Sequence, residues 1–528
     1  MQIMTADEVA ALVEDGDTIL VGGSGNGHSV PETIMAAIEG RFLREGLPRN
    51  ITSVHPVGLG DKAGKGAAHF AHVGLLKRIV CGTYVDSPAI ADMAARNEIE
   101  AYTLPQGAIS MLTREIAGGR PGLITHTGLG TYIDPRQAGG KQSAKATEDL
   151  VEVITLAGRE WLFYKPFPIN VTLLRGTTAD EDGNISMEHE AVYGEMLSMA
   201  QAARRCGGLV VAQVKRLARR ETLPAKSVKI PGMFVDVIVL APDQWQTYST
   251  KHDDAYSGEL RVPLANMPVL PFDERKIIAR RAALELFPGA ICNIGSGIST
   301  GLPTVAAEEN VLDRIVLTNE QGLIGGAPSS DAGAARNYTS IVDQPYQFDF
   351  YDGGGIELAF LSAAEIDPEG NVNVSRFADK IIGVGGFVNI SQNAKKVIFS
   401  GTFTAGGLKV AAEGGKLRIL QEGRHRKFVR AVEQICFNGK AGATLGKQVI
   451  YVTERAVFRL EVGGPVLVEI APGIDLAKDI MAHMDFAPKI SPDLKMMDAR
   501  IFDPRPMGLA TNLGGATRNH PRLKQAVN

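Results

Sequence analysis

Residues 17–31 have the sequence DTILVGGSGNGHSVP, and residues 289–303 repeat its plan as GAICNIGSGISTGLP. In each stretch the apolar run predicts a buried strand, the glycines predict an open loop, and the proline predicts the first turn of a helix. A second pair follows in the same order, LLRGTTADEDGNIS at 173–186 and AFLSAAEIDPEGNVN at 359–373. Two echoes in one order predict two related α/β domains.

The boundaries of these domains follow from helix starts and prolines. The sequence Thr5-Ala6-Asp7-Glu8 is a capping box, and Asp273 is the expected cap of a second helix. Prolines between them make 262–272 a linker, so the predicted domains are 1–261 and 273–528. Apolar runs at 79–81, 209–213, 235–240, 397–400 and 448–453, with a helical stretch at 192–205, predict open, largely parallel sheets covered on both faces.

Composition excludes several classes of protein. The net charge is −4 over 528 residues, with no basic stripe, which argues against a nucleic-acid partner. No apolar run is long enough for a membrane span, and the first residues lack a signal-peptide pattern, so we expect a cytoplasmic protein with no membrane partner. The cysteines are scattered without paired spacing, which fits structural thiols in a reducing compartment: Cys81, Cys206, Cys292 and Cys436.

Glu320 is the strongest candidate for a catalytic residue. Residues 314–328, RIVLTNEQGLIGGAP, place this single acid at the end of a predicted strand and directly before a glycine-rich turn. Ligands of α/β proteins usually bind at the carboxyl ends of strands. A carboxylate there, among residues with little side chain, suits covalent catalysis on a bulky substrate. The alternative is an ordinary glutamate that caps or solvates a turn.

The two glycine loops allow more than one interpretation. Gly25 and Asn26 in the first loop, and Gly297 in the second, follow a strand and precede a helix, as a phosphate or dinucleotide site requires. Neither loop is a GxGxxG, and the lysine of a P-loop is missing, which disfavours a nicotinamide enzyme. Amides that hold an acyl oxyanion or a CoA phosphate remain open.

Three other motifs are interpreted as having no catalytic or metal-binding role. His69 and His72 lack a third ligand at metal spacing, so no metal site is predicted. His28 has no serine or cysteine nucleophile beside it. The basic run RHRKFVR at 424–430 is typical of a solvated surface, and the alternative is a contact for CoA phosphates.

The motifs together resemble those of family I CoA-transferases. The stretch LTNEQGLIG at 317–325 resembles the family's Ser-Glu-Asn-Gly signature, whose glutamate is the covalent nucleophile. Further resemblances are the first glycine loop, LPQG at 104–107, GGIEL at 354–358, GGFVNI at 385–390 and TERAVF at 453–458. Asn319, Gln321, Ser24 and Glu357 depart from the family pattern, in which Ser, Asn, Phe and Asp are usual.

The resemblance implies an α/β fold with the active site at the domain interface. It implies Glu320 as nucleophile, Gly386 as oxyanion amide and Gln106 as an oxyanion or carboxylate contact. The expected CoA or substrate contacts are Gly25, Asn26, Gly297, Gln321, Gly322 and Gly385.

The implied reaction moves CoA between short-chain carboxylic acids, as in the single-chain acetate and propionate group, with CoA as a substrate and no cofactor. A homodimer or homotetramer is expected. The alternatives are a 3-oxoacid CoA-transferase, an acyl-CoA hydrolase, and a non-enzymatic sensor of CoA or a sugar phosphate.

Overall fold

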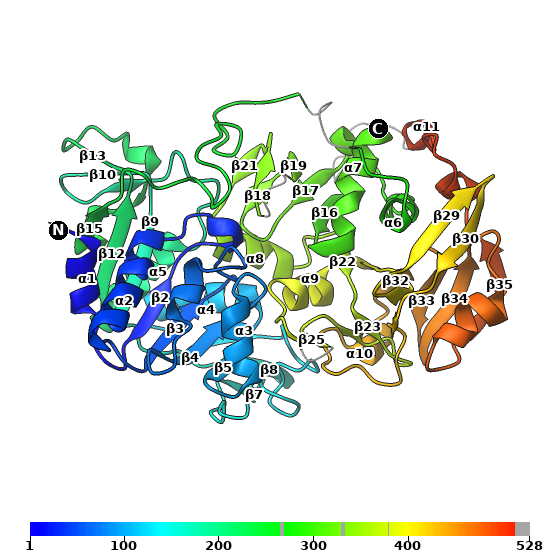
Figure 1. Ribbon diagram of the computed structural model, residues 1–528, viewed down its shortest axis with the longest axis horizontal. Helices are drawn as coiled ribbons and strands as arrows, with labels where there is room; N and C mark the ends of the chain where they lie inside the picture. The colour runs from blue at the N-terminus through cyan, green and yellow to red at the C-terminus, as the bar shows by residue number, and fades with distance from the viewer. Residues whose placement is uncertain (264–268, 329–332, 378–379, 513–528) are drawn as a thin grey trace.

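The computed structural model describes residues 1–263, 269–328, 333–377 and 380–512, which form two large sheets flanked by helices (Figure 1). In the first sheet all neighbouring strands are parallel. Their order is β1 (Gln2–Met4), β15 (Val237–Leu240), β12 (Leu209–Val214), β9 (Val171–Arg175), β2 (Thr18–Val21), β3 (Ile51–His55), β4 (Leu76–Cys81) and β5 (Glu100–Thr103).

The second sheet is parallel in its middle, antiparallel on either side of this middle part, and parallel again in its last pair of strands. Its order is β21 (Ser340–Ile341), β18 (Leu323–Ile324), β17 (Val316–Thr318), β16 (Ile291–Ile294), β22 (Leu358–Ser362), β27 (Lys396–Ser400), β32 (Gln448–Val452), β33 (Ala456–Glu461), β34 (Gly464–Ile470) and β35 (Lys489–Met496). Strands β17, β16, β22, β27 and β32 are parallel to one another. The predicted α/β class with largely parallel sheets is confirmed.

The same strand order occurs in both sheets. The first contains β15-β12-β9-β2-β3 and the second contains β32-β27-β22-β16-β17. Numbered along the chain within each half, both series have the order fifth, fourth, third, first, second. The echoed apolar runs are β2 and β16, followed by β9 and β22, and the two strands of each half lie side by side.

The echoed acidic turns repeat down to single hydrogen bonds. The Asn184 amide donates to Asp180 Oδ1 (2.9 Å), and Asn184 Nδ2 donates to Asp180 Oδ2 (2.9 Å). In the second half, the Asn371 amide and Nδ2 donate in the same way to Asp367, over 3.0 and 2.9 Å. A shared turn of this detail supports a duplicated unit.

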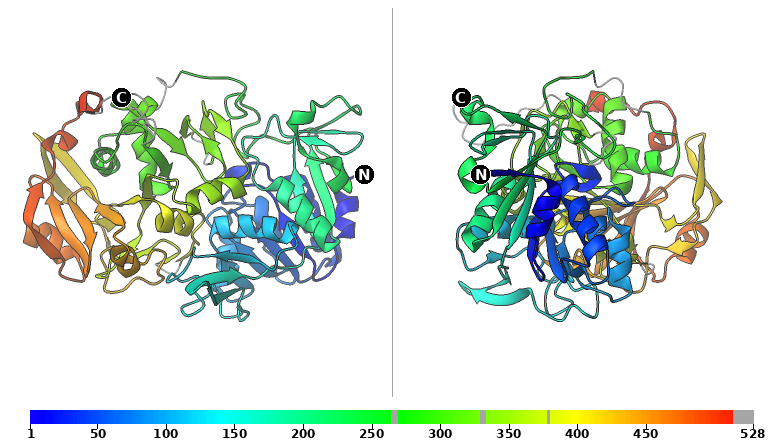
Figure 2. Two further views of the ribbon diagram at one scale, coloured as in Figure 1. Left: turned by 180° about the vertical axis from the view of Figure 1, so that it is seen from behind. Right: turned by 60° about the vertical axis from the view of Figure 1, so that its left-hand side comes forward.

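Helices cover both faces of the first sheet. The outer face packs against α1 (Ala6–Leu12), α2 (Glu32–Glu45) and α3 (Pro88–Ala95), and the inner face against α4 (Gln106–Ala117) and α5 (Met196–Cys206). The inner-face core continues into the second half, where α4 contacts α8 (Gln344–Asp352) and α9 (Phe387–Asn393). Figure 2 shows this layer of helices between the sheets.

The remaining helices are α6 (Glu274–Ala283), α7 (Gly301–Glu308), α10 (Gly439–Thr444) and α11 (Leu509–Asn512). Both predicted caps are present. Thr5 and Glu8 form the capping box of α1, and the Asp273 carboxylate accepts from the first amides of α6. Of the predicted linker, residues 264–268 lie outside the described residues, and the domain boundaries stay a prediction. None of the helices in the described ranges is long and apolar enough to cross a membrane.

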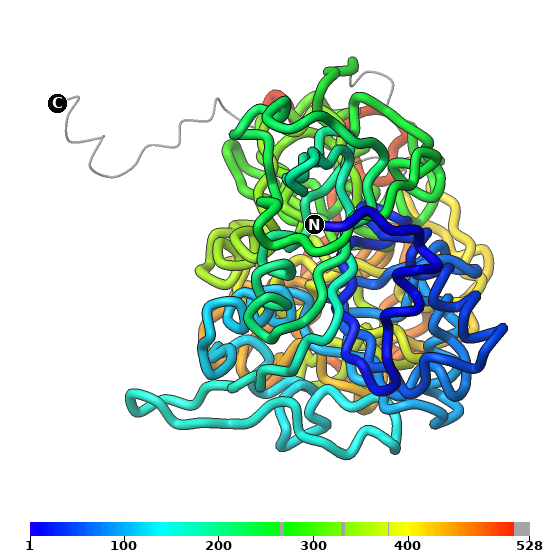
Figure 3. Tube along the Cα trace, turned by 90° about the vertical axis from the view of Figure 1, so that its left-hand side faces the viewer, coloured from blue at the N-terminus to red at the C-terminus, as the bar shows by residue number. Residues whose placement is uncertain are grey.

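One local prediction from the sequence needs correction, and one small sheet was not predicted. The helix predicted from residue 192 begins at Met196, because Gly194 adopts a left-handed conformation (φ +57°) that interrupts it. No pattern in the sequence indicated the antiparallel sheet of β6 (Leu123–Thr125), β7 (Val151–Leu156) and β8 (Arg159–Tyr164). Its β7–β8 hairpin protrudes from the body of the molecule (Figure 3, cyan).

Candidate active site

A cavity of about 430 Å³ lies between the two halves. The first half lines it with the loops after β2, β3 and β4 and with the first residue of α4. The second half lines it with the loops after β16, β17 and β22 and with the segment that leads into α9. Most of these segments follow the carboxyl end of a parallel strand, where α/β folds place ligands.

Glu320 lines this cavity two residues beyond the end of β17. Burial raises the pKa of Glu320 above the usual glutamate value, against hydrogen bonds from its own amide and from Asn293 that lower it. The preceding residues are held from α8: Tyr351 donates to Thr318 Oγ1 (2.8 Å), and Gln347 Nε2 donates to the Asn319 carbonyl (3.1 Å). The carboxylate therefore stands on a fixed support.

Gly386 lies beside Glu320. A Cβ placed on Gly386 would be 3.7 Å from Glu320 Cβ. The backbone of the preceding residue is fixed, because the Gly385 amide donates to the Gly82 carbonyl (2.8 Å) and the Gly385 carbonyl accepts from the Gln106 amide (2.9 Å). Across the described ranges, no hydrogen-bond partner is found for the Gly386 amide. An N–H in this position is available to an oxygen in the cavity.

Gln106 comes from the other half of the molecule and lines the same cavity. It is the first residue of α4, and its side chain is almost fully buried. Its Nε2 donates to Gln344 Oε1 (3.1 Å), and its Oε1 lies beside Gly385, 3.6 Å from where a Cβ on that glycine would be. The three residues that the resemblance assigned to catalysis thus meet at one place.

The six predicted substrate contacts divide into two groups. Gly25, Gln321 and Gly385 line the cavity. Asn26, Gly297 and Gly322 do not line it, although each directly follows a residue that does. Their backbones are left-handed, with φ of +58°, +85° and +99°.

Gly322 shows why such a residue stands behind the cavity wall. A Cβ on it would lie 1.9 Å from the Val342 carbonyl oxygen, so the turn after Glu320 closes only around a glycine. Asn26 is likewise occupied by the chain itself, because its carbonyl accepts from the Tyr248 amide (2.8 Å).

Asp86 and Lys62 line the cavity from the first half, and no sequence motif indicates either residue. Burial raises the pKa of Asp86 to about 6, against the positive charge of Lys62. Asp86 Oδ2 lies 2.6 Å from where a Cβ on Gly25 would be, so the first glycine loop is open to admit this carboxylate. Each residue lies in a loop whose pattern is typical of any turn.

The other motifs lie away from the cavity. His69 contacts Glu32 and Glu39 (2.8 and 2.6 Å) and His72 contacts Glu39 (2.6 Å), so these histidines join α2 to the segment after β3. In the basic run, Arg424, His425 and Arg426 are exposed, and none lines the cavity.

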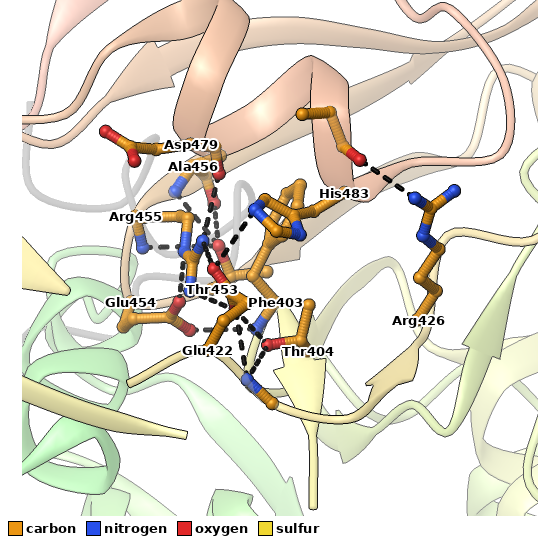
Figure 4. A network of polar contacts seen from close by, with 12 residues as sticks. Phe403, Thr404, Glu422, Arg426, Thr453, Glu454, Arg455, Ala456, Asp479 and His483 are labelled. Atoms are coloured by element: carbon orange, nitrogen blue, oxygen red, sulfur yellow. Dashed lines mark hydrogen bonds and ion pairs between the residues drawn. The ribbon is translucent and has the colours of Figure 1, made fainter. Parts of the chain in front are cut away.

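The TERAVF motif forms a buried ionic network at the start of β33 (Figure 4). Arg455 is fully buried between Glu454 (2.6 Å) and Glu422 (2.8 Å), and it also donates to the Asp479 carbonyl (2.9 Å). Glu454 accepts in turn from the Phe403 amide (2.8 Å). The motif therefore joins the start of β33 to the segments that carry Phe403, Glu422 and Asp479.

Known proteins carry the same architecture. A family model described as coenzyme A transferase matches residues 3–241. The chain is 43% identical to acetate CoA-transferase YdiF of Escherichia coli (strain K12), over 96% of both chains, and 44% identical to caffeate CoA-transferase of Acetobacterium woodii, over 97% of this chain and 99% of that one. The apoenzyme structure of the acyl-CoA transferase YdiF from Escherichia coli O157:H7 superposes with a TM-score of 0.94, at 42% identity and 98% coverage of both chains.

The chain belongs to the coenzyme A transferase family. It is an enzyme that transfers CoA between acids, and the resemblance in its motifs is confirmed.

Proposed function

We propose that this enzyme moves CoA between short-chain carboxylic acids by covalent catalysis at Glu320. The observation that carries the proposal is the meeting of Glu320, Gly386 and Gln106 at one cavity, from both halves of the chain. The acetate CoA-transferase relative supports the substrate class, and a structure of the YdiF protein is described as a thioester complex with CoA.

The proposed chemistry exchanges one thioester for another. The Glu320 carboxylate attacks the acyl-CoA carbonyl, which forms an acyl-glutamyl anhydride and releases the CoA thiolate. The thiolate then attacks the glutamyl carbonyl, so the first acid leaves and a glutamyl-CoA thioester remains. A second acid reverses these two steps and departs as the new acyl-CoA. No external energy source is needed, because the number of thioester bonds is unchanged.

The neighbours of Glu320 supply what a carboxylate nucleophile lacks. Carboxylates are well hydrated and weakly nucleophilic in water, so a cavity that excludes water and fixes the geometry contributes much of the rate. The raised pKa of Glu320 also makes its carboxylate more basic than a glutamate in water. We assign the oxyanion to the Gly386 amide and the Gln106 carboxamide, each worth about 3 kcal/mol when well aimed.

The six expected substrate contacts are assigned by whether they line the cavity. Gly25, Gln321 and Gly385 line the cavity and are assigned to the thioester end of CoA, where small residues and backbone amides allow close approach. Asn26, Gly297 and Gly322 are assigned a supporting role behind that wall. CoA is a substrate in this scheme, and no other cofactor is proposed.

The caffeate CoA-transferase relative favours a second candidate, transfer to larger aromatic acids. Steady-state rates with acetate, propionate, butyrate, acetoacetate and caffeate as acceptors distinguish the two. Short-chain specificity predicts the highest kcat/KM among the first three. A preference for acetoacetate would indicate a 3-oxoacid CoA-transferase, and a preference for caffeate would favour aromatic acids.

Intact mass spectrometry tests the covalent step. Acetyl-CoA should add a CoA-sized increment to the peptide that contains Glu320, and the Glu320→Gln variant should not carry it. Glu357→Gln is the matched control, because Glu357 accepts from the Ile291 amide (2.9 Å) at the opposite end of β16 and should retain the adduct. An adduct elsewhere, or none in the native enzyme, contradicts the mechanism.

Release of CoA without an acceptor acid separates the hydrolase alternative. A hydrolase should release free CoA at the same rate with or without an acceptor acid, whereas the transferase passes CoA to the acceptor and should release little free CoA in either case. A sensor without activity should form no adduct at all. We also propose a cytoplasmic homodimer or homotetramer, which light scattering of the purified protein would test.

A further inference from the structure

A buried chain of polar side chains runs from the cavity into the layer of helices between the two halves. Gln106 Nε2 donates to Gln344 Oε1 (3.1 Å), and Gln344 Nε2 donates to Glu195 Oε2 (2.7 Å). Ser110 Oγ donates to the same oxygen of Glu195 (2.9 Å). All four side chains are at most 1% exposed, so water does not compete for these hydrogen bonds.

Gln106 and Gln344 hold corresponding places in the two halves. Each is the first residue of an interface helix, α4 or α8. The Gln106 amide donates to the Gly385 carbonyl (2.9 Å), and the Gln344 amide donates to the Gly194 carbonyl (2.8 Å). Both glycines are left-handed and lie just before an interface helix, α9 or α5.

The two halves differ at the next residue. Gly386 follows Gly385 and leaves the cavity open beside Glu320, whereas Glu195 follows Gly194 and fills the corresponding place with a carboxylate. This carboxylate has no role in the proposed covalent steps. Its contact with Gln344 nevertheless connects it to Gln106 through one intervening side chain.

The hydrogen-bonding capacity of these groups fixes the direction of the chain. An ionised carboxylate only accepts hydrogen bonds, so Gln344 must turn its Nε2 toward Glu195. Gln344 then offers Oε1 to Gln106, which must respond with its own Nε2, and Gln106 Oε1 is left facing Gly385. A protonated Glu195 can instead donate to Gln344 Oε1, which reverses both amides and leaves Gln106 Nε2 free to face the cavity.

We propose that Glu195 is a positioning residue that sets, through Gln344, which end of the Gln106 carboxamide faces the reacting carbonyl. The inference rests on the proposed function, because it matters only where Gln106 donates to an oxyanion. The protonated form of Glu195 supports that donor, and the ionised form opposes it.

The surroundings of Glu195 bring its pKa into the pH range in which the enzyme can be assayed. Burial raises the pKa of Glu195 to about 7, Ser110 opposes this shift, and the charge of Asp343 at the start of α8 adds to it. Its Oε1 has no hydrogen-bond partner among the described residues, which leaves an ionised Glu195 incompletely compensated.

The facing groups come from three directions. Helix α4 offers only the neutral Ser110, and α8 offers Asp343 and Gln344. On the chain segment of Glu195 itself, the nearby titratable group is Tyr193, whose ring lies against Lys229 (4.0 Å from Nζ to the ring centroid).

The pH dependence of kcat tests the proposal in the full-length enzyme. Native kcat should fall about tenfold between about pH 6 and about pH 8.5, with little change in KM for acetyl-CoA, as the Gln106 donor is withdrawn. Glu195→Gln cannot ionise and retains a donor for Gln344, so it should keep the low-pH kcat throughout. Gln344→Leu removes the connection, so the alkaline limb of the profile, which is the fall of kcat with rising pH, should be absent in this variant. Its kcat should be lower than the native low-pH value.

Asp352→Asn is the matched control. Asp352 is another interface carboxylate, it contacts Asn389 (3.0 Å), and burial raises its pKa to about 6, but it has no contact with Gln106. It should retain the alkaline limb. The proposal is overturned if Glu195→Gln keeps the native alkaline limb, or if Asp352→Asn loses it equally.

The outcome also separates this inference from the proposed function. If the native enzyme forms no Glu320 adduct, the function itself has failed. If the adduct forms and only the pH profiles of native enzyme and Glu195→Gln coincide, the failure belongs to Glu195 alone. Should Glu195→Gln not fold, Gln344→Leu must lose the limb, and its retention there overturns the proposal.

Discussion

Glu320 and Gly386 stand side by side in the cavity wall, with only 3.7 Å between Glu320 Cβ and the position of a Cβ on Gly386. Gly386 has φ −81°, a conformation that every residue adopts. The glycine is therefore not required by the backbone at this position. It leaves space for the substrate carbonyl beside the nucleophile.

Gly386→Ala should consequently reduce activity more than stability. The added methyl would lie 3.2 Å from Ile390 Cδ1 and 3.5 Å from Phe348 Cζ, which small side-chain shifts can absorb. We expect kcat to fall about 10- to 100-fold through a displaced oxyanion. Steady-state kinetics and thermal unfolding measure the two effects.

Gly322→Ala is the control for this prediction, because a Cβ there meets the Val342 carbonyl at 1.9 Å and the φ of +99° is strained. It should lower the yield of folded protein or the melting temperature. An unchanged kcat in Gly386→Ala, or a collapse of its melting temperature, would contradict the assignment.

The raised pKa of Glu320 has two consequences of opposite sign. The carboxylate is the nucleophile, so activity should be lost on acidification at a higher pH than the usual glutamate pKa predicts. A carboxyl whose pKa is higher in the folded than in the unfolded state loses stability as the pH rises between the two values. Glu320→Gln should therefore be inactive yet melt at a higher temperature at neutral pH.

Calorimetry across a pH series measures the second effect. The difference in melting temperature between Glu320→Gln and the native enzyme should vanish at low pH, where both side chains are neutral. A variant less stable than the native enzyme at neutral pH would show that Glu320 is not strained by burial.

The acyl range should depend on Ser24 and Gln321, which depart from the family pattern and meet across the two halves. Gln321 Nε2 lies 3.5 Å from Ser24 Oγ, and both line the cavity. Ser24→Phe adds an aromatic ring to this space. It should lower kcat/KM for butyrate about tenfold more than for acetate, because the cavity loses volume.

Gln321→Asn is the companion variant. It restores the residue usual in the family and shortens the side chain, so it should shift the ratio toward the larger acid. Competition between acetate and butyrate for one acyl-CoA donor measures the ratio directly. Equal ratios in all three proteins would place acyl selection elsewhere in the cavity.

The sequence predicted the frame of the site better than its wall. Buried apolar runs such as β2 and β16 have no other stable environment than a covered parallel sheet, so their pattern was sufficient. Asn26, Gly297 and Gly322 are expected substrate contacts, the first two because glycine loops often expose amides and all three because of the family resemblance. In the folded chain their left-handed backbones serve the turns themselves.

Asp86, Glu195 and Gln344 were not found, because their neighbours come from the opposite half or from distant loops. Glu195 precedes a helix in an ordinary sequence, and only the packing of α4 against α5 and α8 brings it to Gln106. No local pattern encodes such a contact. The roles of the site residues stay predictions.

His69 should make stability depend on pH. Both of its ring nitrogens contact carboxylates, at 2.8 Å from Glu32 and 2.6 Å from Glu39, which only a doubly protonated ring satisfies. Burial lowers the pKa of His69, but these two glutamates outweigh it and raise the pKa above the usual value. The stabilisation is present below the unfolded pKa and is lost as the pH rises through the folded one.

Thermal unfolding in buffers on either side of neutrality tests this sign. The native melting temperature should decline with rising pH in this range, and His69→Gln should be less stable at low pH and lack most of the decline. His425→Gln changes an exposed histidine of the basic run and should follow the native curve. A native-like decline in His69→Gln would exclude this residue as its source.

Arg455 tests whether the C-terminal motif is structural. Arg455→Met leaves Glu454, which is fully buried, without its ionic partner, and Glu422 loses two hydrogen bonds. Breaking a buried ion pair from one side usually costs about 3–5 kcal/mol. Arg459→Met is the matched control, since Arg459 is 56% exposed and its contact with Glu461 is solvated, and it should cost less than about 1 kcal/mol. Urea unfolding gives both values, and the rate of CoA transfer per folded molecule should be native in each.

One outcome would contradict a structural role for Arg455. If Arg455→Met lost most of its kcat without urea while its unfolding curve stayed native, the ionic network would be needed for catalysis. The chemistry in the cavity would then depend on a charge that does not line the cavity.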